Sequence, residues 1–591
     1  MSGQGRSPNT AGGGGDVAML AVIALIAAAI AVVWLWGGLA GAILGRGWPS
    51  TPQPFALLGV LVHLPRHLGD PAAAWPQAAR TRLPGSAGLY ATLASLLAAI
   101  VGCAVFAIRM RRKLPGLFGS PNDGARWASR HDLRQLRAAA ALASGPRPES
   151  NRARRTGRLV LGWHGRRLLY AERRHAVIAF GPPQSGKSAG LAIPALLEWD
   201  GPAVASSIKT DLLGVTLARR QVIGEALVFD PFQLAGVPSH TWSPLRGAAT
   251  WDGALEVAWR LAAAGELDQR GVEGGDFWAV AAEQRLAPLL YAAARTGAGI
   301  EQVVSWAYGQ GARELNDALD RASAGASDEG DRIGARSAYE AVRAFEAQAD
   351  RTRSSIEGTV QALLRAYRFT RVAAGAHGCE ITADRLLARR STLYLIGDAK
   401  ASKLLRPIFL ALLSEVVDRA YELAGEQGGR LKLPLLLCLD EAGNVAPLPN
   451  LAEIASTAPS HNIQLLSIFH DLAQARARYQ QQAETVLNSH RARMLLPGIA
   501  DLDTLRYFSG LVGEQEQREL TRTTGAGGSS RSIGRRRSPL LAAEALRQLP
   551  DGHALLLYGR LPPARVRLRT WFADRRLKRL VAARQHPKGA G

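Results

Sequence analysis

Cysteine is scarce in this chain of 591 residues, which contains only three. Their spacing matches neither a disulfide framework nor a zinc site. The bulk of the protein is therefore expected in a reducing compartment. Acidic residues are also in deficit, because 49 of them stand against 72 lysines and arginines, for a formal net charge of +23. This excess favours polyanionic partners, either nucleic acid or an anionic membrane surface, and does not choose between them.

Charged residues are absent from two long apolar segments, 17–44 and 87–108. Each is long enough to cross a bilayer, which takes about 20 residues. We therefore predict two transmembrane helices, separated by an external loop at 45–86 and preceded by a short cytoplasmic head at 1–16. The basic run Arg109–Lys113 follows the second span, and positive charge marks the cytoplasmic side, so both termini are expected there. A buried core helix is the alternative for either segment.

One glycine-rich segment fills every fixed position of the phosphate-loop pattern G-x-x-x-x-G-K-[ST]. It comprises Gly181, Pro182, Pro183, Gln184, Ser185, Gly186, Lys187 and Ser188. An apolar strand-like run precedes it at 175–180 and a helix-like stretch follows, as a cradle of backbone N–H groups requires. Lys187 would reach the β- and γ-phosphates, and the Ser188 hydroxyl would bind Mg²⁺. The alternative is a chance glycine turn between a strand and a helix.

A second apolar run, 433–439, ends in the acidic pair Asp440 and Glu441. Carboxylates at the end of a buried strand are costly unless their charge is used. We assign Asp440 to Mg²⁺ and Glu441 to polarising the attacking water, so the sequence predicts ATP hydrolysis as well as ATP binding. An exposed strand end with a solvated acidic turn is the alternative.

Apolar strand-like segments alternate with helical stretches over much of the remaining chain, which predicts an α/β fold with a parallel sheet and nucleotide at its carboxyl edge. The further strand candidates are 158–162, 167–170, 203–207, 226–230, 392–396, 464–469, 493–496 and 553–558. Strand signals vanish between Trp251 and about Tyr367, which indicates an inserted all-α domain. The predicted order is a linker at 109–157, the nucleotide-binding domain at 158–250 and 376–573, the insertion at 251–375, and a basic tail at 574–591.

Several further segments, in this order, resemble the coupling proteins of type IV secretion and conjugation systems, the TraG/TraD-type membrane ATPases. The segments are 207–213, 228–231, 242–245, 351–356, 471–479, 488–493, 538–541 and 549–554. The resemblance covers residues 125–573 and implies a RecA-like, FtsK-related motor that forms a homo-hexamer at the bacterial inner membrane. It also implies that ATP hydrolysis drives a DNA strand, with its attached relaxase, toward the channel components of a type IV secretion system.

The family's nucleotide-binding residues carry over onto Gly181, Gly186, Lys187, Ser188, Asp440 and Glu441. This chain has His470 where the family commonly has a glutamine that senses the γ-phosphate, and it retains Gln474. Both are predicted to lie at the nucleotide, where His470 would hydrogen-bond the phosphate or the water. The alternative for His470 is that it merely ends a strand. An arginine that many members carry near 459–462 is missing, which leaves the group that acts across a subunit boundary unidentified. Arg491 and Arg493 are candidate substitutes, and a solvated strand edge is the alternative for them.

The candidate DNA-contacting residues are basic. They would bind phosphates without recognising base sequence, as a translocase needs. Arg531, Arg535, Arg536 and Arg537 lie in a Gly/Ser-rich stretch, 525–538, that we predict to be a flexible loop. Residues 560–588 carry ten basic residues and one acid, and Trp571 is expected in a strand. A solvated tail, or one lying on anionic lipid, is the alternative for this second run.

Three functions remain open from the sequence. The leading one is a DNA-translocating ATPase of a conjugative element. A protein-secretion ATPase would keep the motor and change the cargo, and the arginine-rich stretch favours DNA. A non-hydrolysing membrane receptor would have a degenerate ATP site, which His470 and the missing arginine support and the intact Lys187 and acidic pair oppose.

Overall fold

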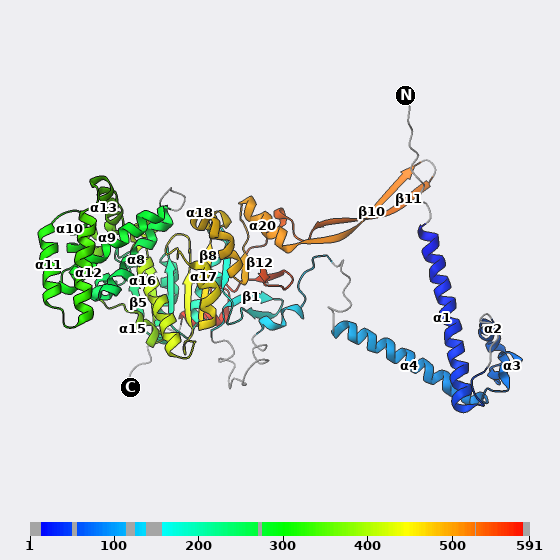
Figure 1. The fold of residues 1–591 in the computed structure, drawn as a ribbon. Helices are drawn as coiled ribbons and strands as arrows, with labels where there is room; N and C mark the ends of the chain where they lie inside the picture. Colours follow the sequence, from blue (N-terminus) through cyan, green and yellow to red (C-terminus); the bar gives the residue numbers. More distant parts are fainter. Residues whose placement is uncertain are drawn as a thin grey trace, which may run out of the picture. The chain divides into compact units, whose positions relative to one another are not determined.

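The computed structural model describes residues 13–49, 56–113, 124–137, 157–269, 275–525 and 528–582. The chain divides into two compact units, residues 1–123 and 124–591, which are treated separately here (Figure 1). Most of the predicted head, much of the predicted linker and the end of the basic tail lie outside the described residues.

The N-terminal unit is helical. Its helices are α1 (Gly13–Leu44), α2 (Ala56–His63), α3 (Gln77–Arg80) and α4 (Ser86–Lys113). By length and composition, α1 over Leu25–Leu44 and α4 over Ser86–Cys103 can each cross a membrane. The indole of Trp36 on α1 donates a hydrogen bond of 2.8 Å to the Leu89 carbonyl on α4, which ties the two helices together.

The second unit is built on one mixed sheet. Among the described residues, the order of its strands is β2-β1-β13-β12-β9-β3-β8-β7-β4-β6-β5. The bounds are β1 Val160–His164, β2 Arg167–Tyr170, β3 Val177–Phe180, β4 Ala203–Ser207, β5 Ala226–Phe229, β6 Thr392–Ile396, β7 Leu435–Leu439, β8 Ile463–Phe469, β9 Ala492–Leu495, β12 His553–Tyr558 and β13 Ala564–Arg567. The strands from β9 to β5 are parallel, whereas β12, β13, β1 and β2 pair antiparallel. This is the predicted α/β core.

Helices cover both faces of the sheet. They are α6 (Ile193–Glu198), α7 (Asp211–Ile223), α15 (Ala383–Ala388), α16 (Ala399–Glu426), α17 (Leu451–Thr457), α18 (Leu472–Tyr479), α19 (Ala483–Ser489), α20 (Leu502–Val512), α21 (Ala543–Arg547) and α22 (Arg575–Ala582). In β3, Ile178 and Phe180 belong to one hydrophobic core, while Val177 and Ala179 belong to the other. Strands buried on both faces read as continuous apolar runs, which is why the sequence located them.

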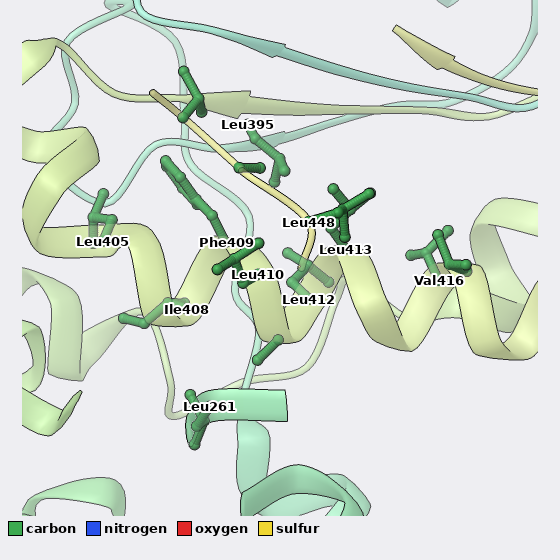
Figure 2. Close-up of a cluster of buried hydrophobic side chains, with 14 of the residues drawn as sticks. Leu261, Leu395, Leu405, Ile408, Phe409, Leu410, Leu412, Leu413, Val416 and Leu448 are labelled. Carbon is green, nitrogen blue, oxygen red and sulfur yellow. The ribbon is translucent and has the colours of Figure 1, made fainter. Parts of the chain in front are cut away.

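The helices between β5 and α15 make up a bundle with no strand among its described residues, as the sequence predicts. They are α8 (Trp251–Gln269), α9 (Gly275–Thr296), α10 (Ile300–Ala307), α11 (Ala312–Ala324), α12 (Glu329–Glu346), α13 (Asp350–Leu364) and α14 (Thr370–Ala374). Helix α16 joins this bundle to the sheet. Figure 2 shows Phe409 of α16 beside Leu395 of β6, and Leu261 of α8 on the other side of the same helix.

The prediction of a flexible loop at 525–538 is wrong. Strand β10 (Glu514–Gly525) pairs antiparallel with β11 (Gly528–Pro539) along its whole length, from Glu514↔Pro539 to Gly525↔Gly528, and this ribbon extends beyond α20 (Figure 1). Gly/Ser composition suggested a linker, but it could not reveal the upstream strand that pairs with the segment. Trp571 also lies in a turn after β13 and not in a strand.

Candidate nucleotide site

The phosphate loop follows the carboxyl end of β3, between the parallel strands β8 and β9. The N–H of Gly181 donates to the Phe469 carbonyl of β8 at 3.1 Å, which fixes the start of the loop. Gly186 has a φ of +89°, a left-handed conformation that favours glycine. A π-helical turn, Ser188–Ala192, then leads into α6. The loop therefore has the strand–loop–helix setting that the motif requires.

Lys187 is held against its own loop. Its Nζ donates to the carbonyl oxygens of Gly181 and Pro182, the latter at 2.8 Å, and lies 3.2 Å from Nδ1 of His470. Burial lowers the pKa of this lysine, while the carboxylates of Asp440 and Glu441 oppose the shift.

Asp440 lies at the carboxyl end of β7, where its Oδ2 accepts a hydrogen bond of 2.5 Å from the Ser188 hydroxyl. Its other oxygen, Oδ1, is buried and has no hydrogen-bond partner among the described residues. Burial raises the pKa of Asp440 to about 6, and the neighbouring Glu441 adds to the shift. The Ser188 hydrogen bond and the charges of Lys187 and Lys209 act in the opposite direction.

This pair of side chains fits a magnesium ion. Mg²⁺ takes oxygen ligands and is usually bound through one or two protein groups together with substrate phosphates. The Ser188 hydroxyl and the Asp440 carboxylate are such ligands, and the unpartnered Oδ1 of Asp440 is a buried acceptor that a cation would satisfy.

Glu441 has a φ of +62°, in the left-handed region that a residue with a side chain occupies at some cost. The Asn444 amide donates to its Oε2 at 3.2 Å, and Nε2 of His470 lies 3.8 Å from the same oxygen. Strain of this kind persists where the surroundings over-determine a functional geometry. The carboxylate of Glu441 is therefore fixed beside the phosphate loop.

Gln474 lies on α18, where its own N–H donates to the capping carboxylate of Asp471 at 2.7 Å. Its side-chain Oε1 accepts from the backbone N–H of His470 at 2.8 Å. In this structure Gln474 therefore holds the backbone of His470, and its contact with nucleotide stays a prediction.

The sequence did not indicate a role for Lys209, although its segment, 207–213, is one of those that resemble the coupling proteins. It follows the carboxyl end of β4, the strand beside β7, and its positive charge acts on both Lys187 and Asp440. The adjacency of β4 and β7 is a property of the sheet order, so no local sequence signal could have revealed this second lysine.

The two arginines proposed to act across a subunit boundary lie at the amino end of β9, whereas the phosphate loop follows the carboxyl end of the parallel strand β3. Arg493 donates from Nε to the Leu487 carbonyl at 2.9 Å and from Nη2 to Asn488 at 3.0 Å. Within one subunit, neither Arg491 nor Arg493 joins the nucleotide site. Their action on a neighbouring subunit stays a prediction.

Residues 127–588 match the family model described as "Type IV secretory system Conjugative DNA transfer". The chain belongs to this family. The resemblance drawn from the ordered motifs is thereby confirmed, and the family match covers both the sheet and the inserted helical bundle.

A curated relative, protein VirD4 of Rhizobium rhizogenes, is 22% identical over 423 residues, which cover 71% of this chain and 61% of the relative. The chain thus spans about three fifths of that relative's length.

Two solved structures of the bacterial conjugative coupling protein TrwB share the fold. The trigonal form of TrwBdeltaN70 in complex with sulphate has a TM-score of 0.56 at 18% identity, covering 77% of this chain and 96% of TrwBdeltaN70. TrwB in complex with ADP and Mg²⁺ has a TM-score of 0.51 at 18% identity, covering 68% and 85%.

Proposed function

We propose that this protein is a membrane-anchored ATPase that couples a relaxase–DNA substrate to a type IV secretion channel and drives DNA translocation by ATP hydrolysis. The observation that carries the proposal is the convergence of Lys187, the Ser188–Asp440 pair and Glu441 at one edge of the sheet. Membership of the conjugative DNA transfer family supports the substrate class.

The chain's own groups account for nucleotide binding. The backbone of residues 181–188 would surround the phosphates, Lys187 would pair with their charge, and Ser188 with Asp440 would hold Mg²⁺. The related TrwB has been solved in complex with ADP and Mg²⁺, which supports this assignment. When bound, ATP supplies the phosphoryl group that is transferred, and Mg²⁺ neutralises charge on the phosphate oxygens.

Hydrolysis requires a group that orients the attacking water. Glu441 is the candidate, because its carboxylate is fixed by Asn444 beside the phosphate loop. His470 lies next to it and contacts Lys187, which supports a role for the imidazole in sensing the γ-phosphate. We assign His470 to orienting Lys187 and the water, and Gln474 to holding the backbone of His470.

The remaining assignments concern the protein's location, its oligomeric state and its partners. We assign α1 and α4 to an anchor in the bacterial inner membrane with both termini cytoplasmic, and residues 251–375 to receiving the cargo. We further propose that the protein forms a homo-hexameric ring and contacts the sugar-phosphate backbone of single-stranded DNA. It would also contact the relaxase and the channel proteins. The basic excess of the chain supports contacts with phosphate.

The test is steady-state ATP hydrolysis by the full chain in nanodiscs, with and without single-stranded DNA, at several protein densities. Lys187→Ala is the blank, and Lys432→Ala, which changes an exposed lysine, is the matched control. Hydrolysis that rises with DNA and with assembly supports the motor. ATP binding without hydrolysis under every condition would contradict the motor function and favour a docking receptor that does not hydrolyse ATP.

A further inference from the structure

A group of arginines beside β1 and β2, at one end of the sheet, has no part in the nucleotide site. Arg130 and Arg137 flank a short 3₁₀ turn, Asp132–Leu136, and the backbone of Arg137 bridges to Leu169 of β2. His164 pairs in register with Arg167 across the β1–β2 hairpin. Arg130, Arg134, Arg166 and Arg167 are exposed. These four residues and Arg137 are termed the arginine face.

The charges of the arginine face act on one another. The pKa of His164 is lowered, first by burial and then by the positive charges of Arg130 and Arg137. The pKa of Arg137 is lowered in the same way, by burial and by Arg167 and Arg130. A gathering of like charges is unfavourable by itself, so it favours a multivalent anion over single counter-ions.

The nearby acid is already engaged. Asp132 is the one acidic residue in segment 124–137, and it takes a bidentate contact from Arg126 at 2.7 and 3.1 Å. The Ser129 hydroxyl and backbone N–H also donate to it. The Arg126 contact lowers the pKa of Asp132, so this acid stays ionised and committed to Arg126.

More basic residues border the arginine face. The exposed Arg565 and Arg567 lie on β13, and the guanidinium of Arg565 stacks 4.6 Å from the ring centre of Trp127. The N–H of Ala125 donates to the Glu514 carbonyl at 2.6 Å, which fastens the base of the β10–β11 ribbon to the same segment. The exposed Arg536 and Arg537 lie near that base.

Segment 124–137 is also close to the apolar spans in sequence. Ten residues separate Gly124 from Lys113, the last residue of α4, and the basic run 109–113 precedes them. A connection of this length reaches at most about 40 Å, at roughly 3.6 Å per residue. A membrane that holds α4 is therefore always within reach of this segment, whatever the orientation of the cytoplasmic unit.

We propose that the arginine face docks on the headgroups of anionic phospholipids. Guanidinium groups bind phosphate in a bidentate manner. Basic residues close to a transmembrane span are attracted by the negative potential of an anionic leaflet, which decays within about 10 Å. Nucleic acid is the weaker occupant, because Arg565 covers the Trp127 ring that could stack on a base, whereas the tether holds the lipid surface near.

The experiment uses the full chain with p-benzoylphenylalanine in place of the exposed Gln135, in nanodiscs of phosphatidylcholine with or without phosphatidylglycerol. Illumination should crosslink residue 135 to lipid in the anionic discs and far less in the neutral ones. The variant Arg130→Gln/Arg166→Gln/Arg167→Gln removes three exposed charges. At about fivefold for each charge near the leaflet, the equilibrium constant for docking should fall on the order of a hundredfold.

The matched control is Arg313→Gln/Arg321→Gln/Arg332→Gln, which removes three exposed charges from α11 and α12 and should leave crosslinking unchanged. Equal crosslinking in the two kinds of nanodisc would overturn the proposal. Crosslinks to an added single-stranded oligonucleotide in place of lipid would also overturn it and assign the surface to DNA. Lys187→Ala should crosslink like the wild type, so loss of the motor and loss of docking are distinguishable.

Discussion

Nδ1 of His470 lies 3.2 Å from the ammonium of Lys187. An ammonium can only donate, so Nδ1 accepts in this contact, and the tautomer that fits it carries the ring hydrogen on Nε2. That hydrogen faces the Glu441 carboxylate, whose Oε2 is 3.8 Å away. One imidazole thus contacts the lysine of the phosphate loop on one side and the acid after β7 on the other.

His470→Gln should retain hydrolysis to within about tenfold, because a glutamine amide also offers both an acceptor and a donor. His470→Ala should lose more, on the order of 10–100-fold in kcat, since Lys187 then keeps only its loop carbonyls. The measurement is steady-state ATPase activity with saturating nucleotide. Equal rates for wild type and His470→Ala would show that the imidazole merely ends the strand.

Glu441→Gln should abolish turnover and spare binding. Removing a general base costs typically 10²–10⁴-fold, whereas the amide can still accept from Asn444. Binding of a fluorescent ATP analogue, measured beside the hydrolysis rate, separates the two effects. Unchanged hydrolysis would move the role of base to another group.

Asp440→Asn should stabilise the ligand-free protein, increasingly so as the pH rises. The folded pKa of about 6 lies above the ordinary value of 3.8, so the folded state holds a proton that the unfolded state releases. Stability from this group therefore falls as pH rises from about 4 to about 6, and asparagine removes that loss. The difference in Tm between variant and wild type should grow from about pH 4 to about pH 6 and then level off, in the absence of Mg²⁺ and nucleotide.

The exposed Asp551→Asn is the control for this experiment and should show no such trend. In the presence of Mg²⁺ and ATP the order should reverse, because the wild type gains binding energy that Asp440→Asn loses. A constant difference in Tm across the pH range would contradict the raised pKa.

Arg220→Met should destabilise the α/β unit by about 2–5 kcal/mol. The buried guanidinium of Arg220 donates to Thr392 Oγ1 at 2.6 Å, to the Gly201 carbonyl at 2.7 Å and to the Trp199 carbonyl. Methionine fills similar space but leaves these acceptors without a donor. Denaturant unfolding followed by near-UV circular dichroism measures the loss, and the exposed Arg389→Met should remain within about 0.5 kcal/mol of the wild type.

The phosphate loop and the acidic pair could be located from sequence because each is a local pattern next to a buried strand. The contact between His470 and Lys187 could not, because it depends on β3 and β8 being neighbours in the sheet. Lys209 was missed for the same reason, through β4 and β7. Residues 525–538 were misread as a loop because Gly and Ser are typical of linkers, and it is pairing with residues 514–525 that makes this segment a strand.

The chain leaves the sheet at β5 and returns at β6, and these two strands pair directly, Ala226 opposite Thr392. The helical bundle is therefore spliced into the outermost corner of the sheet, where its arrival displaces no strand pair. Seen from the sheet, the bundle is one long loop between two hydrogen-bonded neighbours, and α16, which packs on both, is the helix through which a movement of the bundle would reach the sheet.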